Sequence, residues 1–143
     1  NMVQQNIMDK DNKYGIRELP KVEKVVKQEE KYWGYMSTLF DQDGYSIKKI
    51  FMRAGTQSSM EYHVHKKESY YIEKGQLKLG LRIGRGENKS MILNEGDVVH
   101  IPVGLMHMRM AITDTVIIEV STTDDDNDSH IVEDGKTYKF VEK

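Results

Sequence analysis

Two stretches of the sequence decide the fold: EYHVHKKE at residues 61–68 and GDVVHIPVGLMH at residues 96–107. In a β-strand, residues two positions apart point to the same face, so His63 and His65 are expected to turn towards one interior point. His107 ends the second stretch. The two stretches therefore contain four of the five histidines of the chain, of which we interpret His100 as structural.

A metal-binding site is one interpretation of this pattern. Glu68 follows the histidine pair closely enough to bring a carboxylate to the same point. Three imidazoles and one carboxylate suit one divalent metal ion (zinc, manganese, iron or nickel), with positions left for water or substrate. The alternative is a chance pair on a polar strand face together with a hydrogen-bonded core histidine. The residue types alone leave both interpretations open, with His63, His65, Glu68 and His107 as the candidate ligands.

Composition narrows the class of protein. The chain has 143 residues, which fits one domain, and its net charge of −2 favours neither nucleic acid nor an anionic membrane as a partner. It contains no cysteine, which excludes disulfides, thiolate metal sites and a thiol nucleophile. No apolar run approaches the roughly 20 residues of a membrane span, and no signal peptide is visible. We therefore expect a cytoplasmic protein.

From residue 32 onward, short apolar and β-branched runs alternate with Gly-, Asp- and Asn-bearing turns, without a helical period between them. This pattern is typical of an all-β sandwich or barrel. Leu77, Leu79, Leu81 and Ile83 alternate with other residues, which predicts a strand with one buried face. The expected strands are residues 32–40, 45–53, 60–65, 69–73, 76–83, 89–93, 97–101, 107–111, 116–122 and 137–141.

The first 31 residues differ from the rest, because they are mostly polar and charged. We interpret residues 1–31 as a polar N-terminal arm and residues 32–143 as one β-barrel domain. Residues 21–31 are compatible with a short helix or with an extended arm that lies over a neighbouring subunit. An arm of this kind suits a homodimer.

The two stretches and the glycines around them resemble the two motifs of the cupin superfamily. The first motif is matched by Gly55, His63, His65, Glu68 and Gly75, and the second by Gly96, Pro102, Gly104 and His107. The resemblance implies a single-domain cupin, a jelly-roll barrel or double-stranded β-helix, with a metal ion near its mouth. Gly75 and Gly96 would take positive φ in tight turns between strands.

A narrower resemblance, over residues 32–135, is to the small type II mannose-6-phosphate isomerase domains of bacterial sugar-nucleotide enzymes. It is carried by Tyr32-Trp33-Gly34, by residues 59–68 and by Ile118-Glu119-Val120. It implies a metal-dependent aldose–ketose isomerase that acts on a sugar or sugar phosphate through an enediol. Lys66 and Ala111 depart from that family's arginine and asparagine, which bears on phosphate recognition more than on metal binding.

Two further residues are candidates for catalysis. Glu61 shares strand parity with His63 and could be the base, a further ligand or an anchor for an imidazole. Arg109 shares parity with His107 and could meet a phosphate, although an outward surface position is an alternative. Two other functions remain open, a non-catalytic metal- or sugar-binding module and an iron-dependent dioxygenase, because one fold hosts many chemistries.

Overall fold

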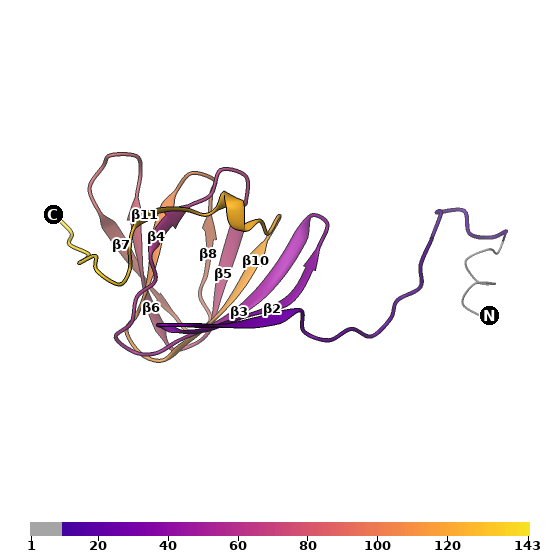
Figure 1. Cartoon of the computed structure of the whole chain (residues 1–143), viewed down its shortest axis with the longest axis horizontal. Coiled ribbons are helices and arrows are strands. Elements are labelled where there is room, and N and C mark those ends of the chain that lie inside the picture. The colour runs from indigo at the N-terminus through magenta and orange to yellow at the C-terminus, as the bar shows by residue number, and fades with distance from the viewer. Residues whose placement is uncertain (1–9) are drawn as a thin grey trace.

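Two antiparallel sheets make up the computed structural model, which describes residues 10–143 (Figure 1). Sheet A contains, in spatial order, β1 (Lys27–Lys31), β2 (Gly34–Gln42), β3 (Tyr45–Met52), β10 (Thr115–Ser121), β5 (Glu68–Lys74) and β8 (Val98–Ile101). Sheet B contains β11 (His130–Glu133), β4 (Met60–Tyr62), β9 (Met106–Ala111), β6 (Gln76–Arg82) and β7 (Lys89–Asn94). A single 3-10 turn, η1 (Asp126–Asp128), precedes β11 within this part of the chain. The expected all-β jelly-roll class is confirmed.

Sheet A changes from polar to apolar along its inner face. Alternate residues of β3, from Ser46 to Met52, are buried, as the period of a strand requires. The register of β10 against β3 and β5 extends this alternation into rows that cross the sheet. The rows are Ser46–Ser121–Glu68, Lys48–Glu119–Tyr70 and Ile50–Ile117–Ile72. One end of the barrel is therefore lined by charged groups and the other by aliphatic ones.

Sheet B faces this surface with a matching arrangement. On β9, His107 and Arg109 point inward and pair in register with Leu81 and Leu79 of β6. The apolar core consists of Trp33, Ile50, Met52, Tyr70, Ile72, Leu77, Leu79, Leu93, Ile101, Ala111 and Ile117. Each fully buried aliphatic side chain of this kind contributes about 1.5–3 kcal/mol to folding. The core thus supplies the stability that a charged barrel end requires.

Several details differ from the expected elements. The strand expected at residues 60–65 ends at Tyr62, and residues 137–141 form no strand, whereas β11 does. Ile83 is 80% exposed, so the buried alternation stops before it. Residues 21–26 have no regular structure rather than a helix, and Lys27–Lys31, assigned above to the arm, pairs with β2. The polar residues of β1 form a strand because β2 offers an edge for main-chain pairing.

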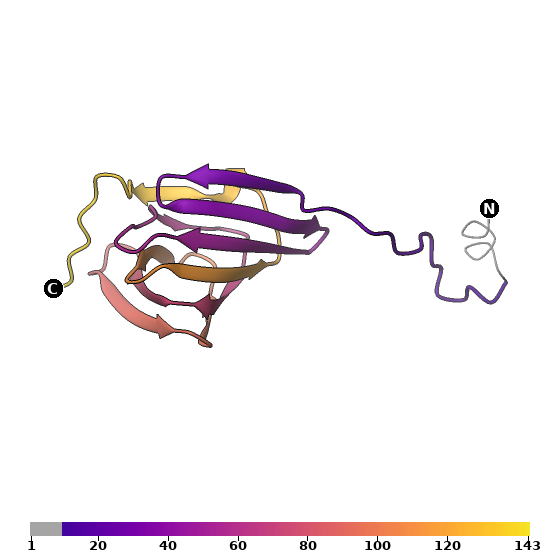
Figure 2. The same ribbon diagram turned by 90° about the horizontal axis from the view of Figure 1, so that it is seen from below.

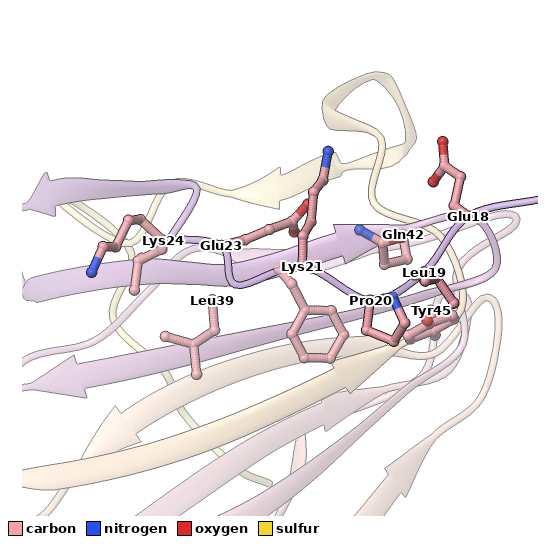
Figure 3. Close-up of a pocket in the computed structure, with 11 residues that line it drawn as sticks. Glu18, Leu19, Pro20, Lys21, Glu23, Lys24, Leu39, Gln42 and Tyr45 are labelled. Atoms are coloured by element: carbon pink, nitrogen blue, oxygen red, sulfur yellow. The ribbon is translucent and has the colours of Figure 1, made fainter. Parts of the chain in front are cut away.

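The remainder of the arm lies outside the barrel. Residues 10–17 extend away from the two sheets on the side opposite to the C-terminus (Figure 2), and residues 1–9 lie outside the described part of the chain. Residues 18–25 run beside β2 and β3 and share with them a surface hollow of about 600 Å³ (Figure 3). Within residues 10–143, no helix has the length and apolar character that crossing a membrane requires.

Gly75 forms the turn between β5 and β6 with a φ of 86°, as the sequence predicted. A side chain there would overlap the main-chain carbonyl oxygen of Asp114. Gly44, in the turn between β2 and β3, has nearly the same φ of 87° but open space around it. Substituting each glycine in turn therefore distinguishes the free-energy cost of a left-handed backbone from that of a steric clash.

We expect Gly75→Ala to destabilise the protein more than Gly44→Ala. Both variants place an L-residue at positive φ, which costs roughly 1–2 kcal/mol. Only Gly75→Ala also pushes against main chain, which adds about 1–3 kcal/mol, the usual cost of overpacking. Urea unfolding midpoints of the two variants provide the measurement. Equal losses in the two variants would contradict the close approach of Gly75 to Asp114.

Candidate functional site

Four side chains meet at the polar end of the barrel. His63 follows β4 directly, Glu68 begins β5, and His107 lies on β9 opposite Glu61 of β4. One donor atom from each of Glu61, His63 and His107 lies within 4.8 Å of the others. Oε1 of Glu68 lies 2.8 Å from Nε2 of His107 and 3.6 Å from Nε2 of His63. Residues distant in sequence are thus brought to one point by the pairing of both sheets.

The two imidazoles of this cluster are oriented by main-chain carbonyls. Nδ1 of His63 lies 3.0 Å from the carbonyl oxygen of Asp128, and Nδ1 of His107 lies 2.9 Å from that of Leu105. A carbonyl oxygen can only accept, so each Nδ1 carries the hydrogen. In the neutral imidazole, Nε2 then presents a lone pair to the interior. This is the tautomer and orientation of a metal-ligating histidine.

The lone pairs have no hydrogen-bond donors. Nε2 of both histidines is buried without a hydrogen-bond partner, although His107 approaches Glu68 to 2.8 Å. A neutral imidazole lone pair and a carboxylate oxygen repel at that distance, so a cation belongs between them, either a proton on Nε2 or a metal ion. Burial acts to raise the pKa of Glu68, but contacts with protonated His107 and His63, together with the charge of Lys66, lower it well below its usual range, so the carboxylate is ionised. Nitrogen and oxygen donors of this kind fit a divalent metal ion.

His65 is not brought to this cluster. Its side chain is exposed, because β4 ends at Tyr62 and the chain bends at residues 64 and 65. The side-chain carboxylate of Asp128 accepts the main-chain N–H groups of Val64, His65 and Lys66, which holds the bend. Strand parity therefore does not apply to residues 63–67, and the convergence expected of His65 with His63 does not occur.

Lys66 occupies the interior instead. Only 7% of its surface is exposed, and Nζ lies 3.4 Å from Glu68 and 3.8 Å from Glu119. Burial acts to lower the pKa of Lys66, but the neighbouring carboxylates raise it, so the ammonium group keeps its charge. Burial raises the pKa of Glu119, and the charge of Glu68 raises it further. Lys66 thus separates two carboxylates that would otherwise repel each other.

A cavity of about 440 Å³ opens beside the cluster. Glu61, Lys66 and Arg109 line it, together with Trp33 and Lys48. Arg109 is 7% exposed, so the outward surface position considered above is excluded. The cavity wall consists mainly of polar and charged side chains, which suits a polar small molecule.

Three residues of this site were not identified from the sequence. The sequence does not predict that Lys66 and Glu119 are buried, because each stands in a charged or alternating segment that is equally compatible with a solvent-exposed position. Asp128 belongs to the acidic run at residues 124–128, which reads as a solvated loop. Its contact with residues 64–66 spans more than sixty positions of sequence, as the 64-residue separation from Val64 illustrates. No local sequence pattern predicts a contact over this separation.

Comparison with known proteins agrees with this architecture. A family model described as Cupin matches residues 39–138. Two curated relatives, both named mannose-1-phosphate guanylyltransferase, are 28% identical (Sinorhizobium fredii strain NBRC 101917 / NGR234) and 33% identical (Salmonella montevideo) over 75 residues. That match covers 52% of this chain but only 14% and 15% of the relatives.

Solved structures show the same fold at low identity. The capsular polysaccharide assembling protein CapF from Staphylococcus aureus superposes with a TM-score of 0.68 at 21% identity, over 75% of this chain and 31% of its own. A Bacillus subtilis oxalate decarboxylase, described with Mn(II) centres, gives a TM-score of 0.66 at 16% identity, over 74% of this chain and 30% of its own. The chain thus spans about a third of each of these structures.

Substitution of single histidines tests which of them bind metal. We expect His63→Ala and His107→Ala to lower metal affinity at least about 100-fold, beyond the 10–100-fold loss typical of residues that only orient a ligand. His65→Ala is the matched control and should keep its metal, because the exposed ring lies outside the cluster. Metal content by elemental analysis and metal titration of each variant give the measurement. Loss of metal from His65→Ala would contradict this assignment.

Acid titration tests whether the Asp128 carboxylate stabilises the bend at residues 64–66. Burial acts to raise the pKa of Asp128, but the three main-chain N–H groups lower it from 3.8 to about 2. A carboxyl group with a lowered pKa stabilises the fold above its unfolded pKa, and this contribution disappears as pH falls from 3.8 towards 2.

We therefore expect Asp128→Asn to be less stable than the wild type near neutral pH, with the difference shrinking over that acidic interval. Urea unfolding of the metal-free protein as a function of pH provides the measurement. Asp126→Asn, which removes a carboxylate two positions away, serves as the control. A difference between wild type and Asp128→Asn that stays constant down to pH 2 would argue against the anchor.

Proposed function

Because the chain belongs to the cupin family, with residues 39–138 matching its model, we propose that it is a metal-dependent sugar isomerase. The substrate would be a sugar or sugar phosphate that interconverts between aldose and ketose forms. The observation that carries the proposal is the convergence of two unpartnered Nε2 atoms and Oε1 of Glu68 beside a polar cavity. Donors arranged in this way suit a bound cation and leave one side accessible to a small molecule.

In this proposal His63, Glu68 and His107 hold the metal ion, and Glu61 stands at the boundary between cluster and cavity. A divalent ion bound there supplies Lewis-acid chemistry, polarising a substrate carbonyl and stabilising the negative charge that develops on its oxygen. Oε1 of Glu61 lies 3.8 Å from Nε2 of His63, and Glu61 also lines the cavity. Its carboxylate can therefore reach a substrate that enters from the cavity side.

Glu61 is the residue that we assign to proton transfer. Isomerisation removes a proton from the carbon next to the carbonyl and returns one to the neighbouring carbon, so a single carboxylate can serve as base and then as acid. The reaction consumes no oxidant or second substrate. The two other carboxylates next to the cluster are less suited, because Glu68 contacts both imidazoles and Glu119 pairs with Lys66.

The relatives favour a carbohydrate over other small molecules. Both curated relatives carry a sugar phosphate in their names, and CapF is named for capsular polysaccharide assembly. The matched segment is a small part of those proteins, so their full activities are not carried over. The resemblance of residues 59–68 to type II mannose-6-phosphate isomerase domains supports the isomerase reaction among the sugar reactions.

Turnover of mannose 6-phosphate to fructose 6-phosphate tests the function. We expect the protein loaded with zinc, manganese or iron to catalyse it, and Glu61→Gln to lower kcat by about 100-fold or more, the usual contribution of a general base. Metal content should stay unchanged in Glu61→Gln if Glu61 is the base. Tyr71→Phe, on the exposed face of β5, is the control.

Three outcomes would redirect the proposal. Loss of metal from Glu61→Gln would make Glu61 a ligand. Thermal stabilisation by sugars without product would favour a binding module. Oxygen consumption by the iron-loaded protein would favour a dioxygenase.

A further inference from the structure

Arg109 differs from the other basic side chains that line the 440 Å³ cavity. Lys48 lies 2.6 Å from Asp124, Lys66 lies 3.8 Å from Glu119, and Lys31 lies 3.1 Å from Glu29. Among residues 10–143, no carboxylate pairs with Arg109, whereas the arginine at position 82 is paired with Glu133 at 3.0 Å. Glu61 and Glu119 lie near enough to act on its charge, but neither forms an ion pair with the guanidinium, so Arg109 contributes an unpaired positive charge to the cavity.

The surroundings of the Arg109 guanidinium leave most of its hydrogen-bond donors unused. Nη1 donates to the hydroxyl of Tyr70 at 3.1 Å, and Nε is fully buried without a partner. The ring centroids of Trp33 and Tyr70 lie 5.3 Å and 5.9 Å from the guanidinium carbon. A guanidinium has five N–H donors in a planar fork, a shape that matches the oxygens of a carboxylate or phosphate.

Burying a charge without an ionic partner is unfavourable, and proteins seldom do so for stability alone. The aromatic rings recover part of the cost through cation–π contacts. The Arg109 guanidinium is buried and unpaired, and it keeps free donors in the wall of an accessible cavity. An anion-binding site has this arrangement before its ligand binds.

We propose that the ligand of this cavity carries an anionic group, a phosphate or a carboxylate, which Arg109 binds. The inference rests on the proposed function only in taking the ligand to be a sugar derivative. Arg109 and His107 lie two residues apart on β9 and face the same interior, about 7 Å apart along the strand. One small molecule can therefore contact Arg109 and the metal cluster together.

Tyr70 connects the two parts of this site. Its hydroxyl accepts a hydrogen bond from Arg109 and donates one to Oε1 of Glu68 at 3.3 Å. An ionised carboxylate can only accept a hydrogen bond, so the Tyr70 hydroxyl supplies the hydrogen of this contact. Tyr70 is thus a positioning residue, which fixes the guanidinium relative to a carboxylate of the metal cluster.

Binding measurements on the metal-loaded full chain test the proposal without any turnover. Mannose 6-phosphate, glucuronate and mannose serve as the phosphate, carboxylate and neutral probes in isothermal titration calorimetry. We expect the wild type to bind at least one anionic probe more tightly than mannose, and the stronger of the two identifies the anionic group. Arg109→Met should reduce that affinity on the order of 10- to 100-fold, whereas Arg109→Lys should retain part of it.

Thermal unfolding separates this role from a structural one. Arg109→Met removes an unpaired buried charge and leaves the Tyr70 hydroxyl free to donate to Glu68, so the ligand-free Tm should stay unchanged or rise. Lys49→Gln is the control, because it removes a positive charge from β3 at a largely exposed position, 41% of whose side chain is accessible. Its affinity for each probe should equal that of the wild type.

The proposal is overturned if the wild type binds mannose as tightly as both anionic probes. It is also overturned if Arg109→Met lowers Tm while keeping the preference for anions, which would assign Arg109 to structure. Failure of the isomerase assay leaves these readouts intact, since none depends on product formation. Unchanged metal content in every variant confirms that the metal cluster itself is not what has been altered.

Discussion

The burial of the Glu68 carboxylate is the constraint on which the barrel interior depends. Only 4% of the residue is exposed, and an ionised group at that depth is costly unless other groups compensate it. His107, His63, Lys66 and Tyr70 surround it, and they come from β9, the bend after β4 and β5 itself. The Glu68 carboxylate is therefore compensated only when the two sheets are closed against each other.

The division of the interior into a polar and an apolar end follows from register. Along β10, Glu119 and Ile117 are adjacent inward positions, yet they belong to rows of opposite character. A slip of β10 by one residue would turn Ile117 outward together with Glu119 and expose it to water, so the apolar pairing of Ile117 holds Glu119 in the interior. Function at the polar end thus relies on packing at the other end.

Periodicity and motif spacing predicted most strands. They also predicted that the side chains of His63, Glu68 and His107 converge, which the structure shows. The prediction for His65 assumed that the strand continues, and the structure ends it at Tyr62. The reason is the carboxylate of Asp128, which takes the N–H groups that a neighbouring strand would otherwise bind. The β1 strand escaped detection because its main-chain pairing with β2 needs no alternation of side chains. The Asp128 contact is long-range, and the β1–β2 hairpin is local but rests on main-chain pairing, so neither produces a side-chain pattern in the sequence.

The charged groups that line the cavity are of two kinds: those that are paired within the protein, and those that are left available to a ligand. Lys48 and Lys66 are matched by carboxylates within reach, whereas Arg109 has no paired carboxylate and the two Nε2 atoms have no hydrogen-bond partner. The unmatched groups lie on sheet B and in the bend beside it, and Tyr70 joins them to sheet A. A ligand that satisfies them would stabilise the closed barrel by mass action, since it binds only where both sheets are assembled. Anion binding and barrel stability are therefore linked through the same few hydrogen bonds.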